Sequence, residues 1–239
     1  ARTLEQISRS ESADHSADSF MLIEETYKNG LKNAPEYGWG HYLYAKFLFN
    51  QVLLQRAYES YQNAFRYFDS IDLYKETGIT LYYLKEPEKA LKYLNSYLHF
   101  LDNDPVALQI AGLCNLELQQ YAVAADLLSK SLAIREDANI WNFLGVCHSY
   151  QKEYEKSLKP FEKAVELDPK LAPVYKNLAA LYGYQLPKKD YQKAYESYQK
   201  YLLLNPSDPE NRIILRRITY LKLRHERQLE AQKIEQGTP

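Results

Sequence analysis

The 239-residue sequence predicts an all-α protein built from helix–turn–helix repeats that stack on one another. Two series of small residues predict this class, because each recurs at nearly constant intervals with large apolar residues beside it. The composition is the third observation. Hydrophobic residues make up 46% of the chain and charged residues 26%, which is ordinary for a globular protein and excludes wholesale disorder.

The two series mark the first and the second helix of each repeat. Two antiparallel helices approach closely only where small residues occupy their crossing point, so the series predict five helix pairs. In the first series the intervals are 33, 34, 33 and 34, and the members are Ala45, Gly78, Gly112, Gly145 and Ala179. In the second series the intervals are 33, 34, 33 and 37, and the members are Ala57, Ala90, Ala124, Ser157 and Ala194. The three extra residues of the last interval lie in Tyr184–Asp190, where Pro187 predicts a lengthened turn.

One segment carries the pattern of a known family. Residues 138–171 read ANIWNFLGVCHSYQKEYEKSLKPFEKAVELDPKL, which closely resembles a tetratricopeptide repeat. His148 stands where the family usually has tyrosine. The resemblance implies a right-handed superhelical solenoid of helix-turn-helix tetratricopeptide repeats with a C-terminal capping helix, in which each helix pair buries its apolar face against its neighbours. The marked positions of the family fall on Trp141, Leu144, Gly145, Ser157, Phe161, Ala164 and Pro169.

The repeats divide the chain into three parts. Residues 1–16 are polar, and we expect them to be a flexible or weakly helical N-terminal segment. Residues 17–208 form the predicted repeat array, which starts with a partial repeat at 17–37. The five full repeats within 38–208 are expected at about 38–70, 71–104, 105–137, 138–171 and 172–208.

Residues 209–239 form the predicted C-terminal capping helix and tail. Ser207 or Asp208 can cap a helix that starts at Pro209, where proline is favoured in the first turn. Four apolar residues then recur at helical spacing and are expected to cover the last repeat: Ile213, Ile214, Ile218 and Leu221.

The resemblance also implies a binding surface, because in this family the first helices line a concave groove. The residues carried over to that lining are apolar and aromatic, and a contiguous exposed patch of this kind usually marks a binding site. The opposite reading stays open, in which the aromatic rings pack against neighbouring first helices and narrow the groove. The predicted partner-binding residues are Trp39, Tyr42, Lys46, Phe49, Lys75, Ile79, Tyr82, Tyr83, Leu113, Leu116, Tyr150, Lys176 and Tyr184.

The sequence therefore predicts a scaffold or adaptor that holds a peptide or helix of a partner protein. Such a protein would act as a scaffold, a co-chaperone or an assembly factor for a larger complex. Two alternatives remain open at this point. One is a carrier or sensor of a small hydrophobic ligand, and the other is a structural subunit that self-associates through its C-terminal helix.

Signatures of catalysis and of cofactor binding were sought in the sequence and not found. It contains no glycine-rich phosphate loop, no GxSxG and no HExxH, so no catalytic residue, metal site or cofactor is assigned. Cys147 and His148 are adjacent, and adjacent helical residues point about 100° apart, so we expect a packed pair rather than metal ligands. Cys114 and Cys147 occupy the same position of neighbouring repeats and are expected to be buried thiols outside any disulfide.

The charge distribution and the apolar runs limit the remaining classes. The formal charge is −1 with both signs well mixed, which disfavours nucleic-acid binding. No uncharged apolar stretch approaches the length of a membrane span, so the chain is expected to be soluble and not membrane-spanning. The chain starts at Ala1 and its only methionine is Met21, so the natural start is expected to lie outside it. A cytoplasmic setting is favoured, while an exported or lipid-anchored form stays open.

Overall fold

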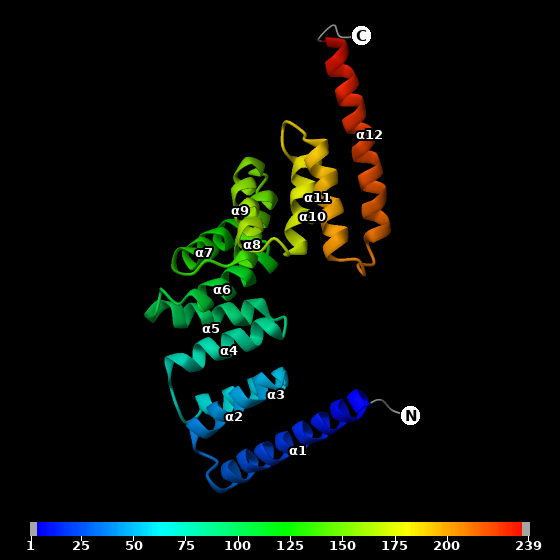
Figure 1. Ribbon diagram of the computed structural model, residues 1–239. Coiled ribbons are helices and arrows are strands. Elements are labelled where there is room, and N and C mark those ends of the chain that lie inside the picture. Colours follow the sequence, from blue (N-terminus) through cyan, green and yellow to red (C-terminus); the bar gives the residue numbers. More distant parts are fainter. Residues whose placement is uncertain (1–3, 236–239) are drawn as a thin grey trace. The chain divides into compact units, whose positions relative to one another are not determined.

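The computed structural model describes residues 4–235 and divides the chain into two compact units, Ala1–Leu101 and Asp102–Pro239. Within the described residues all regular structure is helical, which confirms the all-α class (Figure 1). The first unit contains α1 Leu4–Asn33, α2 Gly38–Asn50, α3 Leu54–Phe65, α4 Ile71–Tyr83 and α5 Pro87–Phe100. The second contains α6 Pro105–Glu117, α7 Tyr121–Ile134, α8 Ala138–Tyr150, α9 Tyr154–Leu167, α10 Ala172–Ala180, the π-helical turn η1 Leu181–Gln185, α11 Tyr191–Leu204 and α12 Asn211–Glu235.

Consecutive helices pack as antiparallel pairs. The first unit contains the pairs α2–α3 and α4–α5, and the second contains α6–α7, α8–α9 and α10–α11 (Figure 1). The second helix of one pair then packs on the first helix of the next, as α3 does on α4 and α7 on α8. The first helices of the five pairs begin at Gly38, Ile71, Pro105, Ala138 and Ala172, which are the residues at which the sequence repeats start.

Glycine is required where the two helices of a pair cross. A Cβ atom added to Gly145 in α8 would lie 2.5 Å from Cε1 of Phe161 in α9. A Cβ atom added to Gly112 in α6 would lie 2.8 Å from Cδ2 of Leu128 in α7. Real Cβ atoms do not approach other atoms so closely, so a larger residue would push the helices apart or displace the ring.

The turns inside the first four pairs share one backbone geometry. In the first of them, the Val52 amide donates to the Phe49 carbonyl at 2.9 Å and the Leu53 amide donates to the Leu48 carbonyl at 3.0 Å. This pair of bonds is the Schellman ending of a helix, which places one residue in the left-handed region. That residue is not glycine in any of the four turns: it is Val52, Lys85, Gln119 and Lys152, with φ of 61°, 64°, 60° and 61°.

The fifth pair differs because of its three extra residues. The sequence predicted that they lengthen the turn within Tyr184–Asp190. In the structure α10 instead continues through the π-helical turn η1, and the Asp190 amide then donates to the Tyr182 carbonyl at 3.0 Å. Part of the insertion therefore extends the first helix, since a π turn accommodates an extra residue within a helix.

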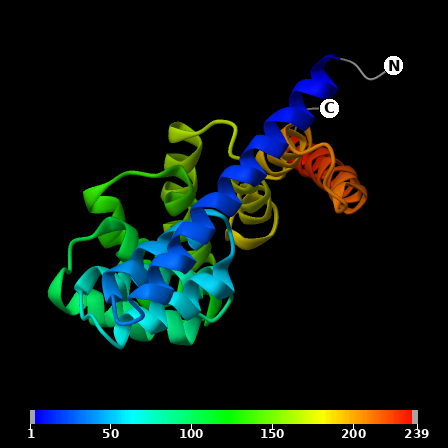
Figure 2. The same ribbon diagram turned by 90° about the horizontal axis from the view of Figure 1, so that it is seen from below.

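At the N-terminus, α1 takes the place of the partial repeat. It has 30 residues against 13 in α2, so it extends beyond the α2–α3 pair (Figure 2). Of the segment predicted to be flexible or weakly helical, residues 4–16 belong to α1 and residues 1–3 lie outside the described part. Whether this part of the helix is weak stays a prediction.

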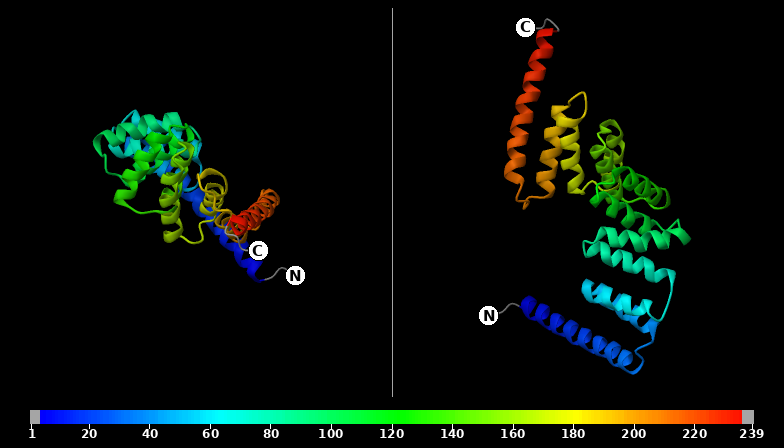
Figure 3. Two further views of the ribbon diagram at one scale, coloured as in Figure 1. Left: turned by 90° about the horizontal axis from the view of Figure 1, so that it is seen from above. Right: turned by 180° about the vertical axis from the view of Figure 1, so that it is seen from behind.

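At the C-terminus, α12 packs along α11 and extends past it (Figure 3). Ile214, Ile218 and Leu221 are buried as predicted, but Ile213 is exposed and does not cover the last repeat. The helix also starts two residues later than predicted. Residues 208–211 form a turn in which the Asp208 carboxylate accepts a hydrogen bond from the Glu210 amide at 2.6 Å, so Pro209 precedes the helix.

Candidate functional site

In the first unit, the predicted partner-binding residues lie on two neighbouring helices. The first helices α2 and α4 contact each other directly, although α3 separates them in the sequence. The surface that they form together is called the α2–α4 face below. Its residues are Trp39, Tyr42, Lys46 and Phe49 of α2 and Lys75, Ile79, Tyr82 and Tyr83 of α4.

Aromatic rings connect much of the α2–α4 face. The Trp39 ring stacks on Tyr42, with their centroids 4.9 Å apart. Phe49 and Tyr83 bridge the two helices with a centroid distance of 5.9 Å, and Tyr82 lies 5.3 Å from Tyr83. Trp39 and Tyr83 are 43% and 50% exposed, whereas Tyr42 is only 5% exposed. The face therefore has exposed rings at two places, and Tyr42 supports one of them from below.

Two lysines add positive charge to the α2–α4 face. The Lys46 Nζ atom lies 3.4 Å from Oε1 of Glu76 and 5.5 Å from the centre of the Tyr42 ring. Partial burial acts to lower the pKa of Lys46, but Glu76 and Tyr42 outweigh it and hold the pKa above its ordinary value. The Lys75 Nζ atom lies 5.2 Å from the centre of the Tyr97 ring. Both ammonium groups are therefore oriented by neighbouring side chains.

In the second unit, the predicted residues do not form one cluster. Leu113 of α6 is buried and Leu116 is half-buried. Tyr150 at the end of α8 is exposed, and its ring stacks on Tyr121 at 4.7 Å. Lys176 of α10 pairs with Glu210, at the turn before α12.

One of these residues lines a small hollow of about 180 Å³, together with residues of other helices. It lies between α8 and the α10–η1 segment, and Tyr150 lines it. Leu113, Leu116, Lys176 and Tyr184 do not line it. The other lining residues are Val146, Ser149, Phe161, Asn177, Ala180 and Gln185.

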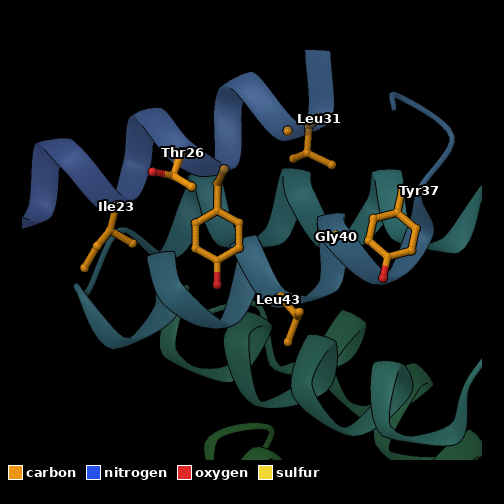
Figure 4. A pocket seen from close by; sticks show the side chains of 8 residues that line it. Ile23, Thr26, Leu31, Tyr37, Gly40 and Leu43 are labelled. Carbon is orange, nitrogen blue, oxygen red and sulfur yellow. The ribbon is translucent and has the colours of Figure 1, made fainter. Parts of the chain in front are cut away.

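Sequence reasoning missed an apolar hollow of the first unit, which lies between α1 and α2. Its volume is about 480 Å³, and Figure 4 shows the side chains around it. The sequence contained a signal for it, because residues 17–37 were predicted to form only a partial repeat, preceded by the polar residues 1–16. The lining residues are Ile23, Thr26, Tyr27, Gly30, Leu31, Tyr37, Gly40 and Leu43.

Cys147 and His148 are adjacent in α8, and each has its own surroundings. The His148 Nδ1 atom lies 2.9 Å from Oε2 of Glu153, in the turn after α8. Cys147 is fully buried, and burial raises the pKa of its thiol to about 12. Within residues 4–235, no three His, Cys, Asp or Glu side chains are grouped as metal ligands. The same part of the chain contains no helix that is long and apolar enough to cross a membrane.

Comparison with known proteins agrees with this geometry. The family profile described as "Tetratricopeptide repeat" matches residues 138–171. A chain in the structure of the APC/C hetero-tetramer Cut9-Hcn1 superposes with a TM-score of 0.66 over 84% of this chain and 40% of that chain, at 18% identity. YrrB, described as a TPR protein with an unusual peptide-binding site, gives a TM-score of 0.64 over 77% of this chain and 94% of its own, at 19% identity.

The chain has the fold of a tetratricopeptide-repeat solenoid. Solenoids of this class serve as scaffolds for protein–protein contacts. Identities below 20% to the solved structures show the shared fold alone, because unrelated processes use the same repeat array.

Among curated sequences, this chain is similar to the photosystem I assembly protein Ycf3 of Rippkaea orientalis (strain PCC 8801 / RF-1). The two are 27% identical over 104 residues, which cover 37% of this chain and 60% of that protein. It is also similar to the BBSome complex member BBS4 of Xenopus tropicalis, at 27% identity over 55% of this chain and 26% of that protein. The matched part thus spans less than two thirds of either relative.

Proposed function

We propose that this protein is a scaffold that binds a segment of a partner protein on the α2–α4 face. One observation carries the proposal: Trp39 and Tyr83 are half-exposed rings on neighbouring first helices, and each has an aromatic neighbour beneath or beside it. Rings that are partly desolvated and already held in place anchor protein interfaces at low entropic cost.

The lysines of the face define the kind of segment that fits. Lys46 and Lys75 lie beside aromatic rings of the first unit, so their ammonium groups can donate to backbone carbonyls or acidic side chains of the partner. An extended or helical segment with apolar residues flanked by acidic ones matches this surface. The role is binding rather than catalysis, and it suits assembly of a larger complex. The names of the relatives, an assembly protein and a member of a complex, are compatible with that role.

The second unit offers further contacts to the same partner class. Tyr150 is exposed at the end of α8 beside the 180 Å³ hollow, where an apolar side chain of the ligand can enter. Leu116 and Tyr184 are the other predicted contacts with accessible surface there. Leu113 of α6 is buried, and Lys176 forms a salt bridge with Glu210.

Peptide selection with matched variants tests this proposal. Peptides selected from a displayed library on the wild-type chain are measured against the Trp39→Ala/Tyr83→Ala variant and against Tyr67→Ala/Phe100→Ala. The second variant also removes two exposed rings from the first unit, one in the turn after α3 and one at the end of α5. We expect at least a tenfold loss of affinity for the first variant and little change for the control. Equal binding by all three proteins would move the site away from the α2–α4 face.

A small hydrophobic ligand is the second candidate, and the hollow between α1 and α2 favours it. Its volume of about 480 Å³ lies within the range of small-molecule sites, and its lining is mostly apolar. Native mass spectrometry of the purified chain would show such a ligand as a bound mass that organic solvent removes.

A further inference from the structure

The turn between η1 and α11 forms a hollow with the middle of α12, within the second unit (Figure 1). Its volume is about 380 Å³, and it is called the basic hollow below. The lining contains four cationic side chains and no carboxylate, although the whole chain has a formal charge of −1. The lining residues are Lys188, Lys189, Tyr191, Arg224, Arg227 and Gln228.

Two separate features of the sequence bring these cations together. Lys188 and Lys189 lie in Tyr184–Asp190, the segment that contains the three extra residues of the fifth repeat. Arg224 and Arg227 are three positions apart in α12, so they lie on the same side of that helix. The basic hollow therefore combines the insertion with the part of α12 that extends past Leu221.

Two of the four cations are held in position by neighbouring groups. The Lys189 ammonium donates to the Tyr184 carbonyl at 2.9 Å and to the Leu186 carbonyl. Arg224 donates to the Tyr191 hydroxyl at 3.1 Å, and its guanidinium carbon lies 5.4 Å from the centre of the Tyr191 ring. A guanidinium oriented in this way keeps its other N–H groups available to a ligand. Part of the binding geometry therefore exists before a ligand arrives.

The carboxylates near the basic hollow are directed elsewhere. Asp190 accepts a hydrogen bond from the Lys193 amide at 2.9 Å and lies 3.9 Å from the Lys193 ammonium. Glu226 and Glu230 belong to α12 but do not line the hollow. Among residues 4–235, no carboxylate forms a salt bridge with any of the four cations. Like charges gathered in one hollow repel one another, so a bound anion relieves this repulsion.

The amount of charge indicates which anion fits. A carboxylate carries one negative charge and two acceptor oxygens. A phosphate monoester carries nearly two charges and three strong acceptor oxygens on one phosphorus atom. Guanidinium groups also match phosphate geometry, because they can donate two parallel hydrogen bonds to it. A phosphate group therefore complements the two arginines and two lysines better than a single carboxylate does.

An adjoining hollow indicates how the phosphate is attached. Its volume is about 420 Å³, and it shares Lys188, Lys189 and Gln228 with the basic hollow. Side-chain amides can both donate and accept hydrogen bonds, so they pair well with a peptide backbone. A peptide can place residues here, whereas a free phosphate ion would occupy the basic hollow alone. The other residues of this lining are Tyr182, Leu186, Asp190, Gln192, His225, Leu229 and Gln232.

We propose that the basic hollow binds the phosphorylated side chain of a partner segment, and that the adjoining hollow binds the residues next to it. Arg224 and Arg227 donate to the phosphate oxygens, and Lys188 adds a further positive charge. The site belongs to the second unit and the α2–α4 face to the first, so this proposal does not depend on the function proposed above.

A defined phosphopeptide tests the proposal. The probe is a blocked pentapeptide with phosphoserine at its centre and alanine and glycine on either side. It is titrated into the ¹⁵N-labelled wild-type chain and followed by NMR. We expect saturable shifts of the amide signals of residues 186–191 and 224–232. The same peptide with unphosphorylated serine should bind at least tenfold more weakly.

Two double variants of equal charge separate a specific site from general attraction. Arg224→Gln/Arg227→Gln should weaken binding of the phosphopeptide at least tenfold. Arg212→Gln/Arg216→Gln is the matched control, because it removes two exposed arginines of the same helix that do not line either hollow. It should change the affinity less than twofold. Circular dichroism of both variants checks that the helices are retained.

Several results would overturn the proposal. Absence of saturable binding, or equal weakening by both double variants, would leave only unspecific attraction between charges. Equally tight binding of a peptide with glutamate at the centre would assign the hollow to acidic segments. Equally tight binding of inorganic phosphate would assign it to a free anion. Binding to vesicles of phosphatidylcholine and phosphatidylserine that Arg224→Gln/Arg227→Gln alone abolishes, without binding of the phosphopeptide, would assign it to a membrane surface.

Discussion

Arg56 of α3 donates a hydrogen bond to the carboxylate of Glu24 of α1, two residues that lie 32 positions apart in the sequence. Tyr44 of α2 completes the cluster, because it donates to Glu24 at 3.0 Å and accepts from Arg56 at 2.8 Å. One carboxylate thereby connects three helices. The Arg56 hydrogen bond outweighs the effect of burial and lowers the pKa of Glu24 to about 2.

The first prediction concerns the pH dependence of this cluster. Because the folded pKa of Glu24 is below its ordinary value of 4.5, the carboxylate stabilises the fold above that value and loses its effect as the pH falls toward about 2. We expect Glu24→Gln to lower the free energy of unfolding by about 1 kcal/mol at pH 7. The difference from wild type should shrink through this window in urea unfolding at pH 7, 4 and 2.5. Glu25→Gln, at the exposed neighbouring residue, should have little effect at any of these values.

The second prediction compares two glycines. Gly145→Ala places a methyl group 2.5 Å from the Phe161 ring and should destabilise the fold by about 1–3 kcal/mol. Gly30→Ala meets open space in the interior of α1 and should stabilise it by about 0.5–1 kcal/mol, because alanine favours the helix. Chemical unfolding of both variants gives the two signs. A gain for Gly145→Ala would show that α8 and α9 do not cross as closely as described.

The third prediction concerns the left-handed turn residues. Val52 has φ of 61°, a conformation that costs a β-branched residue more than glycine. We expect Val52→Gly to raise the free energy of unfolding by about 0.5–1 kcal/mol after the entropic cost of glycine is subtracted. Gln51→Gly is the control, since Gln51 has φ of −89° and glycine there should only destabilise the fold. If both variants lose stability, the left-handed turn is absent in solution.

The fourth prediction concerns the two thiols. Cys114 and Cys147 are fully buried and neither forms a disulfide. Since the thiolate is the reactive species, the raised pKa of Cys147 adds to its inaccessibility. We expect both to react with an aromatic disulfide reagent at least about 100-fold more slowly than a cysteine introduced at exposed Val123, until denaturant is added. Rapid labelling of the folded chain at one of the two native cysteines would show that its repeat opens locally.

The repeat pattern predicted the helix pairs well because the requirement for small residues at the crossings is local and periodic. Gly112 and Gly145 lie where the sequence placed the crossing, each against a large side chain of the second helix. The four left-handed turn residues could not be predicted in the same way. Valine, lysine and glutamine occupy them, and only the hydrogen bonds of the Schellman ending, such as that from Leu53 to Leu48, impose the conformation.

For the candidate sites too, part could be predicted from the sequence and part could not. The helix on which each partner-binding residue lies follows from the repeat, so the placement of Trp39 and Tyr83 on first helices was predictable. Their exposure was not, and neither was the burial of Tyr42 and Leu113 at equally ligand-facing positions. Exposure depends on how the side chains pack around each position, for example on the packing of Tyr42 between Trp39 and Tyr61. The predicted site residues as a set remain a prediction.

The burial pattern of α12 has a consequence for the end of the last repeat. Ile214, Ile218 and Leu221 are buried against α11 with the same spacing as Val174, Leu178 and Leu181 of the preceding repeat, whereas Leu215 and Thr219 are exposed. α12 therefore shields α11 from solvent on one side while its own opposite side stays in contact with water.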